Sequence, residues 1–268
     1  MQWHEALTLG ILQGLTEFLP ISSTAHLRII PHYLGWEDPG TAFSAVIQLG
    51  TLISVIFYFS NDIKRLFLAT INSLKHRNIH HSEESLMAWA IVAGTLPIAV
   101  LGLSFREFIE TEARTLSTIG TSLIILAIGL IIAERVGRKS KKMKDLSFWN
   151  IQCIGLCQAL ALIPGCSRSG STIMGGLFAG LGRSEAARFS FLLGLPAISA
   201  SGLLEFIGLF KDGLGQQETA NILIGITAAG VSGYCAIGFL LRFLSRYGTD
   251  VFSIYRILIG IAIIYTTW

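Results

Sequence analysis

Eight apolar stretches divide this chain, and only six of them run unbroken for long enough to cross a membrane. Crossing about 30 Å of hydrocarbon takes about 20 helical residues, or somewhat fewer where flanking side chains reach the interface. The expected spans are residues 42–59, 87–103, 117–133, 189–210, 220–243 and 253–268. They predict an all-α, polytopic membrane protein with six full transmembrane helices.

The two remaining apolar stretches are interrupted by proline and polar residues. Residues 6–34 are cut at Pro20 before a Ser-Ser-Thr run, and residues 148–181 are cut at Pro164 and Gly165 before a Ser-Arg-Ser run. Each half is too short to cross alone. We therefore expect two re-entrant helical hairpins, which are tolerated where the irregular backbone is buried in protein or lines a cavity.

Composition excludes several classes of protein. Only 14% of residues are charged, against about 25% in a typical soluble domain, so an ordinary cytosolic enzyme is not expected. No basic stripe with interleaved aromatic residues suggests nucleic acid, and the four cysteines lack metal-binding or disulfide spacing. Residues 1–5 lack the basic region of a signal peptide, so the first apolar stretch is expected to be retained.

The order of elements predicts an internal repeat. A hairpin and three spans in residues 1–133 are followed by a basic linker, 134–147, and by another hairpin and three spans in 148–268. Because each half has an odd number of spans, the second copy would be inverted within one membrane domain. Residues 13–22 also resemble residues 158–167, and residues 43–49 resemble residues 189–195. Chance similarity between leucine-rich helices is the alternative explanation for these matches, and the matching order of elements favours the repeat.

The basic residues predict the orientation. Fourteen lie on one side of the expected spans: Lys64, Arg65, Lys75, Arg77, Arg135, Arg138, Lys139, Lys141, Lys142, Lys144, Arg183, Arg188, Arg242 and Arg246. Arg106, Arg114 and Lys211 lie on the other side. The positive-inside rule places the larger set in the cytoplasm, so the first hairpin opens outward, the second opens inward, and their tips meet near the midplane.

Three basic residues, Arg28, Arg168 and Arg256, fall outside these loops. A charge at membrane depth costs about 2.5 to 3.5 kcal/mol on insertion scales, which makes each a candidate functional residue. For Arg256, reaching outward to the interface or pairing with Glu205 is the alternative.

The hairpin tips carry the side chains that could bind a ligand or take part in a reaction. Gln13 and Glu17 share one helical face, Ser22 or Ser23 can cap the helix after Pro20, and Ser23 shares a face with His26. In the second tip, Gly165 permits a close turn, serines can cap the next helix, and Arg168 offers a planar fork to phosphate or carboxylate oxygens.

Two helix N-termini directed at one point favour an anion, and a phosphate-rich ligand fits best. An ionised Glu17 would repel such a ligand unless a proton or a divalent cation lay between them. These residues therefore indicate phosphoryl chemistry with a bound cation rather than passive anion binding. The alternative is a purely structural role for both motifs. The Ser-Ser-Thr run would then hydrogen-bond the preceding backbone carbonyls, and the Ser-Arg-Ser motif would be a tight turn whose arginine reaches the interface.

Several motifs resemble the undecaprenyl-diphosphatase family, integral membrane enzymes also known as bacitracin-resistance proteins, over essentially the whole chain. They are QGLTEFLPISSTAH at 13–26, IQLG at 47–50, PGCSRSGST at 164–172, FSFLL at 189–193 with Pro196, and IYR at 254–256. The resemblance implies interdigitated inverted repeats in the bacterial cytoplasmic membrane, with an active site opening to the outer face. It also implies release of phosphate from undecaprenyl diphosphate, which recycles the carrier lipid for peptidoglycan and confers bacitracin resistance.

The resemblance also implies site residues. The catalytic candidates are Glu17, Ser23, His26 and Arg168, and the substrate-binding candidates are Gln13, Ser22, Thr24, Gly165, Ser167, Ser169, Thr172 and Arg256. Many relatives have a glutamate where this chain has Gln13, which leaves Glu17 as the expected ligand of a divalent cation, Mg²⁺ or Ca²⁺.

Several alternatives stay open. We expect Ser23 to attack the terminal phosphorus while His26 or Glu17 accepts its proton; the rivals are direct attack by water with His26 as base, or His26 itself as nucleophile. The competing class is an inverted-repeat transporter or flippase for phosphate or a lipid phosphate. Gly225, Gly230 and Gly233 suit either a homodimer interface or packing within the chain.

Overall fold

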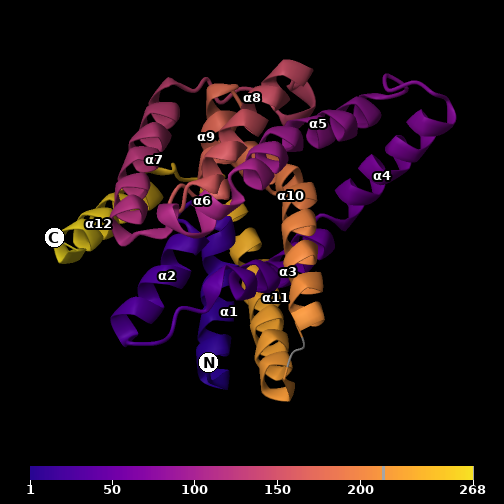
Figure 1. Ribbon diagram of the computed structural model, residues 1–268. Helices are drawn as coiled ribbons and strands as arrows, with labels where there is room; N and C mark the ends of the chain where they lie inside the picture. Colours follow the sequence, from indigo (N-terminus) through magenta and orange to yellow (C-terminus); the bar gives the residue numbers. More distant parts are fainter. Residues whose placement is uncertain (213–214, 268) are drawn as a thin grey trace.

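The computed structural model of the chain describes residues 1–212 and 215–267, without the side chains of 106, 110, 112 and 209–212 (Figure 1). Trp268, at the end of the last expected span, and the side chains of Arg106 and Lys211, assigned above to the outer side, therefore lie outside the described residues. The described part is all-helical, as predicted, and forms no strand.

The helices follow one another along the chain with short connections. They are α1 (Trp3–Phe18), α2 (Ser23–Leu34), α3 (Gly40–Tyr58), α4 (Ser60–Lys75), α5 (Glu83–Ser104), α6 (Arg106–Glu110), α7 (Leu116–Val136), α8 (Phe148–Ala159), α9 (Arg168–Phe178), α10 (Arg183–Asp212), α11 (Gln216–Leu244) and α12 (Asp250–Thr267). Short 3₁₀ turns, η1 (Glu112–Arg114), η2 (Met143–Asp145) and η3 (Leu160–Leu162), lie before α7, before α8 and after α8.

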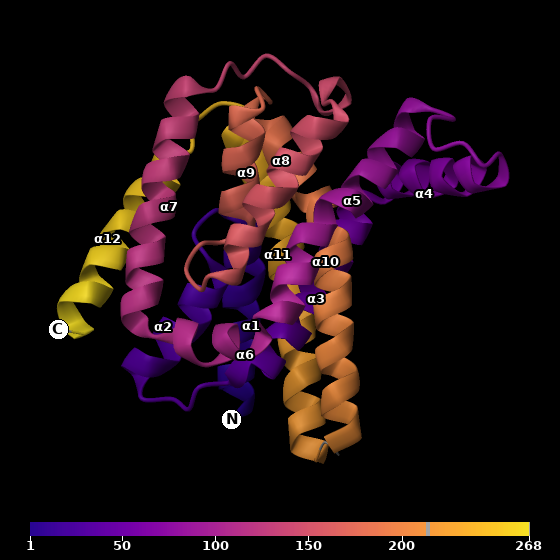
Figure 2. The ribbon, with the colours of Figure 1, turned by 45° about the horizontal axis from the view of Figure 1, so that its top comes forward.

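Six of these helices are long and apolar enough to cross a membrane: α3, α5, α7, α10, α11 and α12. Each covers one of the six expected spans within the described residues, although α3 ends one residue before the expected end at 59. The prediction of six spanning helices is therefore confirmed by length and composition. In both views of the ribbon α7 and α12 run side by side, away from the other spanning helices (Figures 1 and 2).

The two interrupted stretches form pairs of short helices, α1 with α2 and α8 with α9. Their lengths, 16, 12, 12 and 11 residues, are each below the about 20 needed to span a bilayer. The helices are interrupted near Pro20 and Pro164, as predicted. The structure contains no membrane, so re-entry of these pairs stays a prediction.

Glycines let the helices of the two halves approach closely. A Cβ on Gly14 of α1 would lie 2.0 Å from Ser232 Oγ of α11, and a Cβ on Gly155 of α8 would lie 2.2 Å from the Gly94 carbonyl oxygen of α5. Gly225, Gly230 and Gly233 also face other helices of the same chain, the first against Ile47 and the last against Phe18. The glycine face considered for a dimer is therefore used within the chain, and the homodimer stays untested.

Helix α4 was not predicted. With the first part of α5 it forms an arm that projects from the bundle (Figures 1 and 2). At the base of the arm, the Asp62 carboxylate pairs with Arg65 of α4 and with Arg188 of α10. Farther out, Trp89 Nε1 donates a hydrogen bond to Ser73 Oγ at 2.8 Å, which joins α5 to α4.

Candidate active site

The turns before α2 and α9 lie against each other. Ser22 caps α2 by accepting a hydrogen bond from the Ala25 amide at 3.4 Å, and Ser167 caps α9 by accepting one from the Gly170 amide at 3.1 Å. Both serines have a positive φ, 77° and 62°, which is uncommon for residues other than glycine. Ser169 Oγ donates to the Leu19 carbonyl at 3.2 Å and so joins the two turns directly.

Glu17 stands at the centre of the site and is only 5% exposed. Its Oε2 accepts hydrogen bonds from Ser23 Oγ at 2.7 Å and from Gln13 Nε2 at 2.9 Å. Its Oε1 accepts one from Arg168 Nη2 at 3.1 Å. The carboxylate therefore connects the candidate nucleophile, Ser23, to the candidate phosphate ligand, Arg168.

Helix α10 supports the Arg168 guanidinium from behind. Arg168 Nη1 donates to the Ser190 carbonyl at 3.4 Å. The Thr172 hydroxyl donates to the Arg168 carbonyl at 2.8 Å and also bonds the Ser190 hydroxyl, which ties α9 to α10. Ser167 and Ser169 lie 3.2 Å apart through their hydroxyls at the start of α9. Thr172 and Ser169 thus position Arg168 and the turn.

His26 forms its hydrogen bonds with groups other than the Ser23 hydroxyl. Its Nδ1 is 2.7 Å from the Ser22 carbonyl oxygen, and its Nε2 is 2.7 Å from the Tyr255 hydroxyl, whose ring stacks on the imidazole with 7° between the planes. A carbonyl can only accept, so Nδ1 carries the proton and a neutral imidazole accepts from Tyr255 at Nε2. Glu17, rather than His26, accepts the hydrogen bond of the Ser23 hydroxyl. Tyr255 was not singled out from the sequence, although it lies in the IYR motif.

Arg256 is fully buried beneath both turns. Its guanidinium donates to the carbonyls of Pro20 at 3.1 Å, Gly165 at 2.9 Å, Leu123 at 3.2 Å and Cys166 at 3.4 Å. The first of these belongs to the α1–α2 turn, and Gly165 and Cys166 belong to the turn before α9. Arg256 therefore holds the two turns together through their backbones.

A cavity of about 440 Å³ opens beside Glu17. Five of the predicted site residues line it: Glu17, Ser23, Thr24, Ser167 and Arg168. The walls that α5 and α10 supply are largely apolar and include Ile98, Leu103, Ile198 and Leu204, whereas α3 supplies Thr41, Ser44 and Gln48. Of the other predicted residues, Gln13, Ser169 and Thr172 are hydrogen-bonded to lining residues, to Glu17, Ser167 and Arg168 respectively. Ser22, His26, Gly165 and Arg256 do not line the cavity. The end at Glu17 and Arg168 is thus polar, and the apolar side chains of α5 and α10 suit a hydrocarbon chain, while Arg28 and Arg114 also line the cavity.

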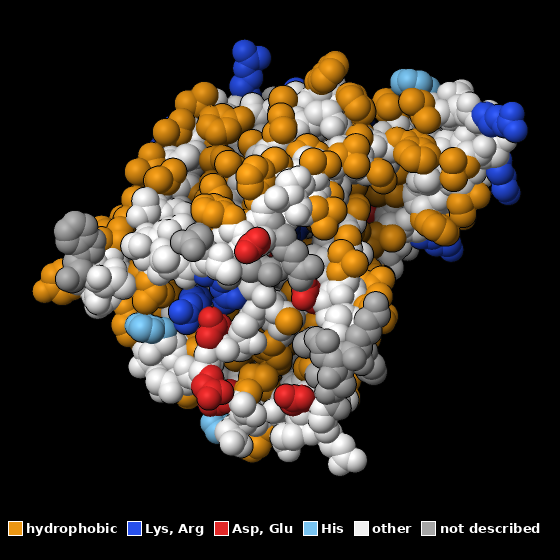
Figure 3. All heavy atoms as spheres, viewed as in Figure 1, with side chains coloured by type: hydrophobic (Ala, Val, Ile, Leu, Met, Phe, Trp, Pro, Cys, Tyr) orange, Lys and Arg blue, Asp and Glu red, His pale blue; other side chains and the backbone are white. Residues whose placement is uncertain are grey.

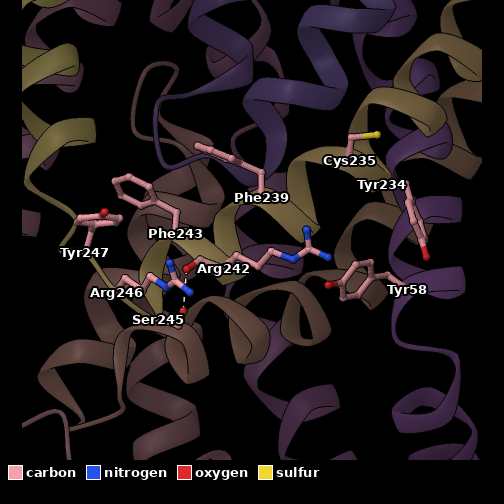
Figure 4. A pocket seen from close by; sticks show the side chains of 10 residues that line it. Tyr58, Tyr234, Cys235, Phe239, Arg242, Phe243, Ser245, Arg246 and Tyr247 are labelled. Atoms are coloured by element: carbon pink, nitrogen blue, oxygen red, sulfur yellow. Dashed lines mark hydrogen bonds between the residues drawn. The ribbon is translucent and has the colours of Figure 1, made fainter.

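A larger cavity, of about 860 Å³, lies at the C-terminal ends of α3 and α11 (Figure 4). Aromatic side chains and two arginines, Arg242 and Arg246, line it, and none of the predicted site residues does. The smaller cavity is therefore the candidate active site, because the acid, the hydroxyl and the guanidinium group meet there.

The described residues form no group of three or more histidine, cysteine or acidic side chains that could hold a metal ion. The site does contain oxygen donors of the kind that Mg²⁺ and Ca²⁺ prefer. Besides Glu17, the Gln13 Oε1 atom is buried and finds no hydrogen-bond partner within the described part of the chain. This unpaired oxygen belongs to the amide whose Nε2 donates to Glu17. The donor set fits a cation that also binds substrate oxygens.

Comparison with known proteins identifies the family. The family model for bacitracin resistance protein BacA matches residues 6–262. An undecaprenyl-diphosphatase of Chloroherpeton thalassium is 50% identical over 96% of this chain and 94% of its own length. Proteins of the same name from Chlorobium phaeobacteroides and Myxococcus xanthus are each 46% identical over 98% of this chain and over 96% and 89% of their own lengths. The chain is therefore a multi-pass membrane protein that belongs to the bacitracin resistance protein BacA family.

Proposed function

We propose that this protein hydrolyses undecaprenyl diphosphate to undecaprenyl phosphate and inorganic phosphate. The hydrogen-bonded series Ser23–Glu17–Arg168 at the polar end of the cavity is the observation that carries the proposal. A diphosphate needs a cationic fork and backbone N–H groups, and a polyprenyl chain needs an apolar wall. The cavity offers all three, and the similar proteins bear the name of this activity.

Arg168 and the N-termini of α2 and α9 bind the diphosphate. The free N–H groups and the dipoles of two helix starts favour the negative charge, and the guanidinium can take two phosphate oxygens at once. Substrate would exchange the Glu17–Arg168 ion pair for an Arg168–phosphate pair, which leaves the Glu17 carboxylate free to act on Ser23. The apolar walls hold the first isoprene units.

Ser23 Oγ attacks the terminal phosphorus while Glu17 takes its proton across the 2.7 Å hydrogen bond. The Oγ–phosphorus bond forms as the bridging phosphorus–oxygen bond breaks, and undecaprenyl phosphate leaves. Water then hydrolyses the phosphoserine and releases inorganic phosphate. Attack by water or by His26 remains the rival, and the hydrogen bond from Ser23 to Glu17 favours the serine.

A divalent cation, Mg²⁺ or Ca²⁺, fits beside this route. Glu17 and the unpaired Gln13 Oε1 would hold it together with the oxygens of the diphosphate. Such ions are commonly bound through one or two carboxylates and substrate phosphates, so one acidic residue suffices. The cation would neutralise charge on the diphosphate, and within the chain Gln13 orients the Glu17 carboxylate toward Ser23.

The setting we propose is the bacterial cytoplasmic membrane, with two inverted repeats and the site open to the outer face. The basic connections support this orientation. Reciprocal packing supports the repeat: α1 packs on α11 of the second half, whereas α8 packs on α5 of the first, and α3 pairs with α10. The two capping serines with positive φ occupy matching turns.

A purified detergent-solubilised protein tests the proposal. We expect phosphate release from undecaprenyl diphosphate, its loss with a chelator, and its loss in Ser23→Ala, whereas Ser245→Ala, at an exposed position at the end of α11, stays active. Near-normal turnover of Ser23→Ala would eliminate the serine nucleophile. Absence of release from the wild type, together with movement of a lipid phosphate across liposomes, would instead support the transporter.

A further inference from the structure

Two arginines outside the catalytic group share a single carboxylate. Arg28 of α2 and Arg114 of η1 both contact Asp38, which lies between α2 and α3. The Arg28 Nη1 to Asp38 Oδ2 distance is 3.4 Å, and Arg114 Nη2 lies 3.3 Å from Oδ1. One negative charge therefore faces two positive charges, and the group carries a net positive charge.

Both arginines line the same cavity as Glu17, Ser23 and Arg168. Arg28 follows Thr24 by one helical turn, and both side chains line the cavity, so one face of α2 runs along it. Arg28 is five residues beyond Ser23, which places its Cα about 7.5 Å farther along the helix axis. A hollow with basic atoms beside acidic atoms is visible over α2 in the space-filling view (Figure 3).

The geometry leaves hydrogen-bonding capacity for a ligand. Charge-assisted hydrogen bonds are usually about 2.7 to 2.9 Å long, and the contacts to Asp38 are longer. The side chains of Arg28, Arg114 and Asp38 are 29%, 20% and 34% exposed, so the group is partly open. Arg28 Nε is nevertheless buried and has no hydrogen-bond partner among the residues described. A buried donor without an acceptor is costly, and a bound anion would supply one.

We propose that Arg28 and Arg114 form a second phosphate subsite of the cavity, separate from the one at Arg168. Two planar guanidinium forks on either side of one carboxylate suit a tetrahedral anion with several oxygens. The ligand is a phosphate group, from either the lipid diphosphate head on entry or the inorganic phosphate on release. Asp38 holds the forks in place when the subsite is empty and weakens binding enough for the ligand to leave. This inference rests on the proposed function.

Kinetics of Arg28→Gln, Arg114→Gln and the double variant test the subsite, with Arg242→Gln, an arginine of the other cavity, as the control. We expect kcat to stay within about twofold, because neither arginine contacts the reacting groups. A roughly tenfold rise in KM for undecaprenyl diphosphate identifies the lipid head, and a roughly tenfold rise in the inhibition constant of inorganic phosphate identifies the product. If neither constant departs from that of the control, the proposal is wrong.

Two further measurements make the result independent of folding and turnover. Asp38→Asn removes the competing carboxylate, so phosphate binding should tighten by about two- to fivefold, a gain that misfolding does not produce. Titration calorimetry with inorganic phosphate detects the subsite even in a protein that releases no phosphate. If the wild-type protein releases no phosphate from the lipid but binds inorganic phosphate in a way that depends on Arg28, the proposed function alone is refuted. If phosphate binding is unaffected by Arg28→Gln and by Asp38→Asn, the subsite is refuted.

Discussion

Gly194 lies directly against the guanidinium group of Arg168. A Cβ at Gly194 would stand 1.5 Å from Nη1 and 2.4 Å from Cζ of that arginine. In Gly194→Ala the guanidinium must therefore leave its present position, which disturbs its hydrogen bonds to Glu17 and Ser190. Because only the far end of a flexible side chain is displaced, we expect the protein to fold, while kcat/KM falls by about 10² to 10³ as a positioned charge donor is lost.

Gly208→Ala is the matched control for this change. It lies on the same helix, α10, and a Cβ there meets nothing within 4 Å. Phosphate release by both variants, together with thermal unfolding in detergent, separates the two effects. Normal activity in Gly194→Ala would mean that Arg168 does not act from the position described here.

Glu17→Gln keeps the size of the side chain and removes its charge. Ser23 then loses its proton acceptor and Arg168 loses its ion-pair partner. We expect kcat to fall by about 10² to 10⁴, the usual contribution of a general base. Steady-state phosphate release measures this, with Glu84→Gln, an exposed residue at the start of α5, as the control. A Glu17→Gln protein with wild-type kcat would move the role of base to His26.

Local features of the site were predictable from sequence spacing. Gln13 and Glu17 are four apart on one helix, and the structure joins them by a hydrogen bond of 2.9 Å. The proline breaks and the capping of α2 by Ser22 follow from backbone chemistry in the same way. The six spans follow from the thickness of the bilayer, which dictates the length of an apolar helix.

Contacts between distant segments were not predictable. His26 and Ser23 share a helical face by spacing, yet the imidazole bonds Tyr255, 229 positions away. Gly194 appears in the sequence as one glycine among 28, and only the packing of α9 on α10 reveals its contact with Arg168. Helix α4 mixes charged and apolar residues, and its anchoring partner Arg188 lies 126 positions from Asp62. Such pairings depend on the fold as a whole.

The arm formed by α4 and α5 should loosen in acid. Burial raises the pKa of Asp62, but hydrogen bonds from Arg188 and Arg65 outweigh it and hold that pKa below its ordinary value. A carboxyl whose pKa is lower in the folded state stabilises the fold above its unfolded pKa, about 3.9, and this contribution is lost as the pH falls through the folded value. Asp62→Asn should therefore unfold at a lower temperature than wild type at pH 7, and the gap should narrow below about pH 4. Parallel melting curves across this range would contradict the prediction.

Arg256→Met should destabilise the protein as well as inactivate it. The variant leaves carbonyls of both turns without their donor, and each buried unpaired group costs about 1 to 3 kcal/mol. We expect a lower unfolding temperature, together with loss of phosphate release because Ser23 and Arg168 lose their mutual placement. A direct substrate-binding role, as the family resemblance implied, instead predicts a raised KM at an unchanged unfolding temperature. Arg246→Met, an exposed arginine in the other cavity, controls for loss of charge. Thermal unfolding and KM, measured on the same preparations, therefore distinguish a residue that holds the two turns together from one that holds the substrate.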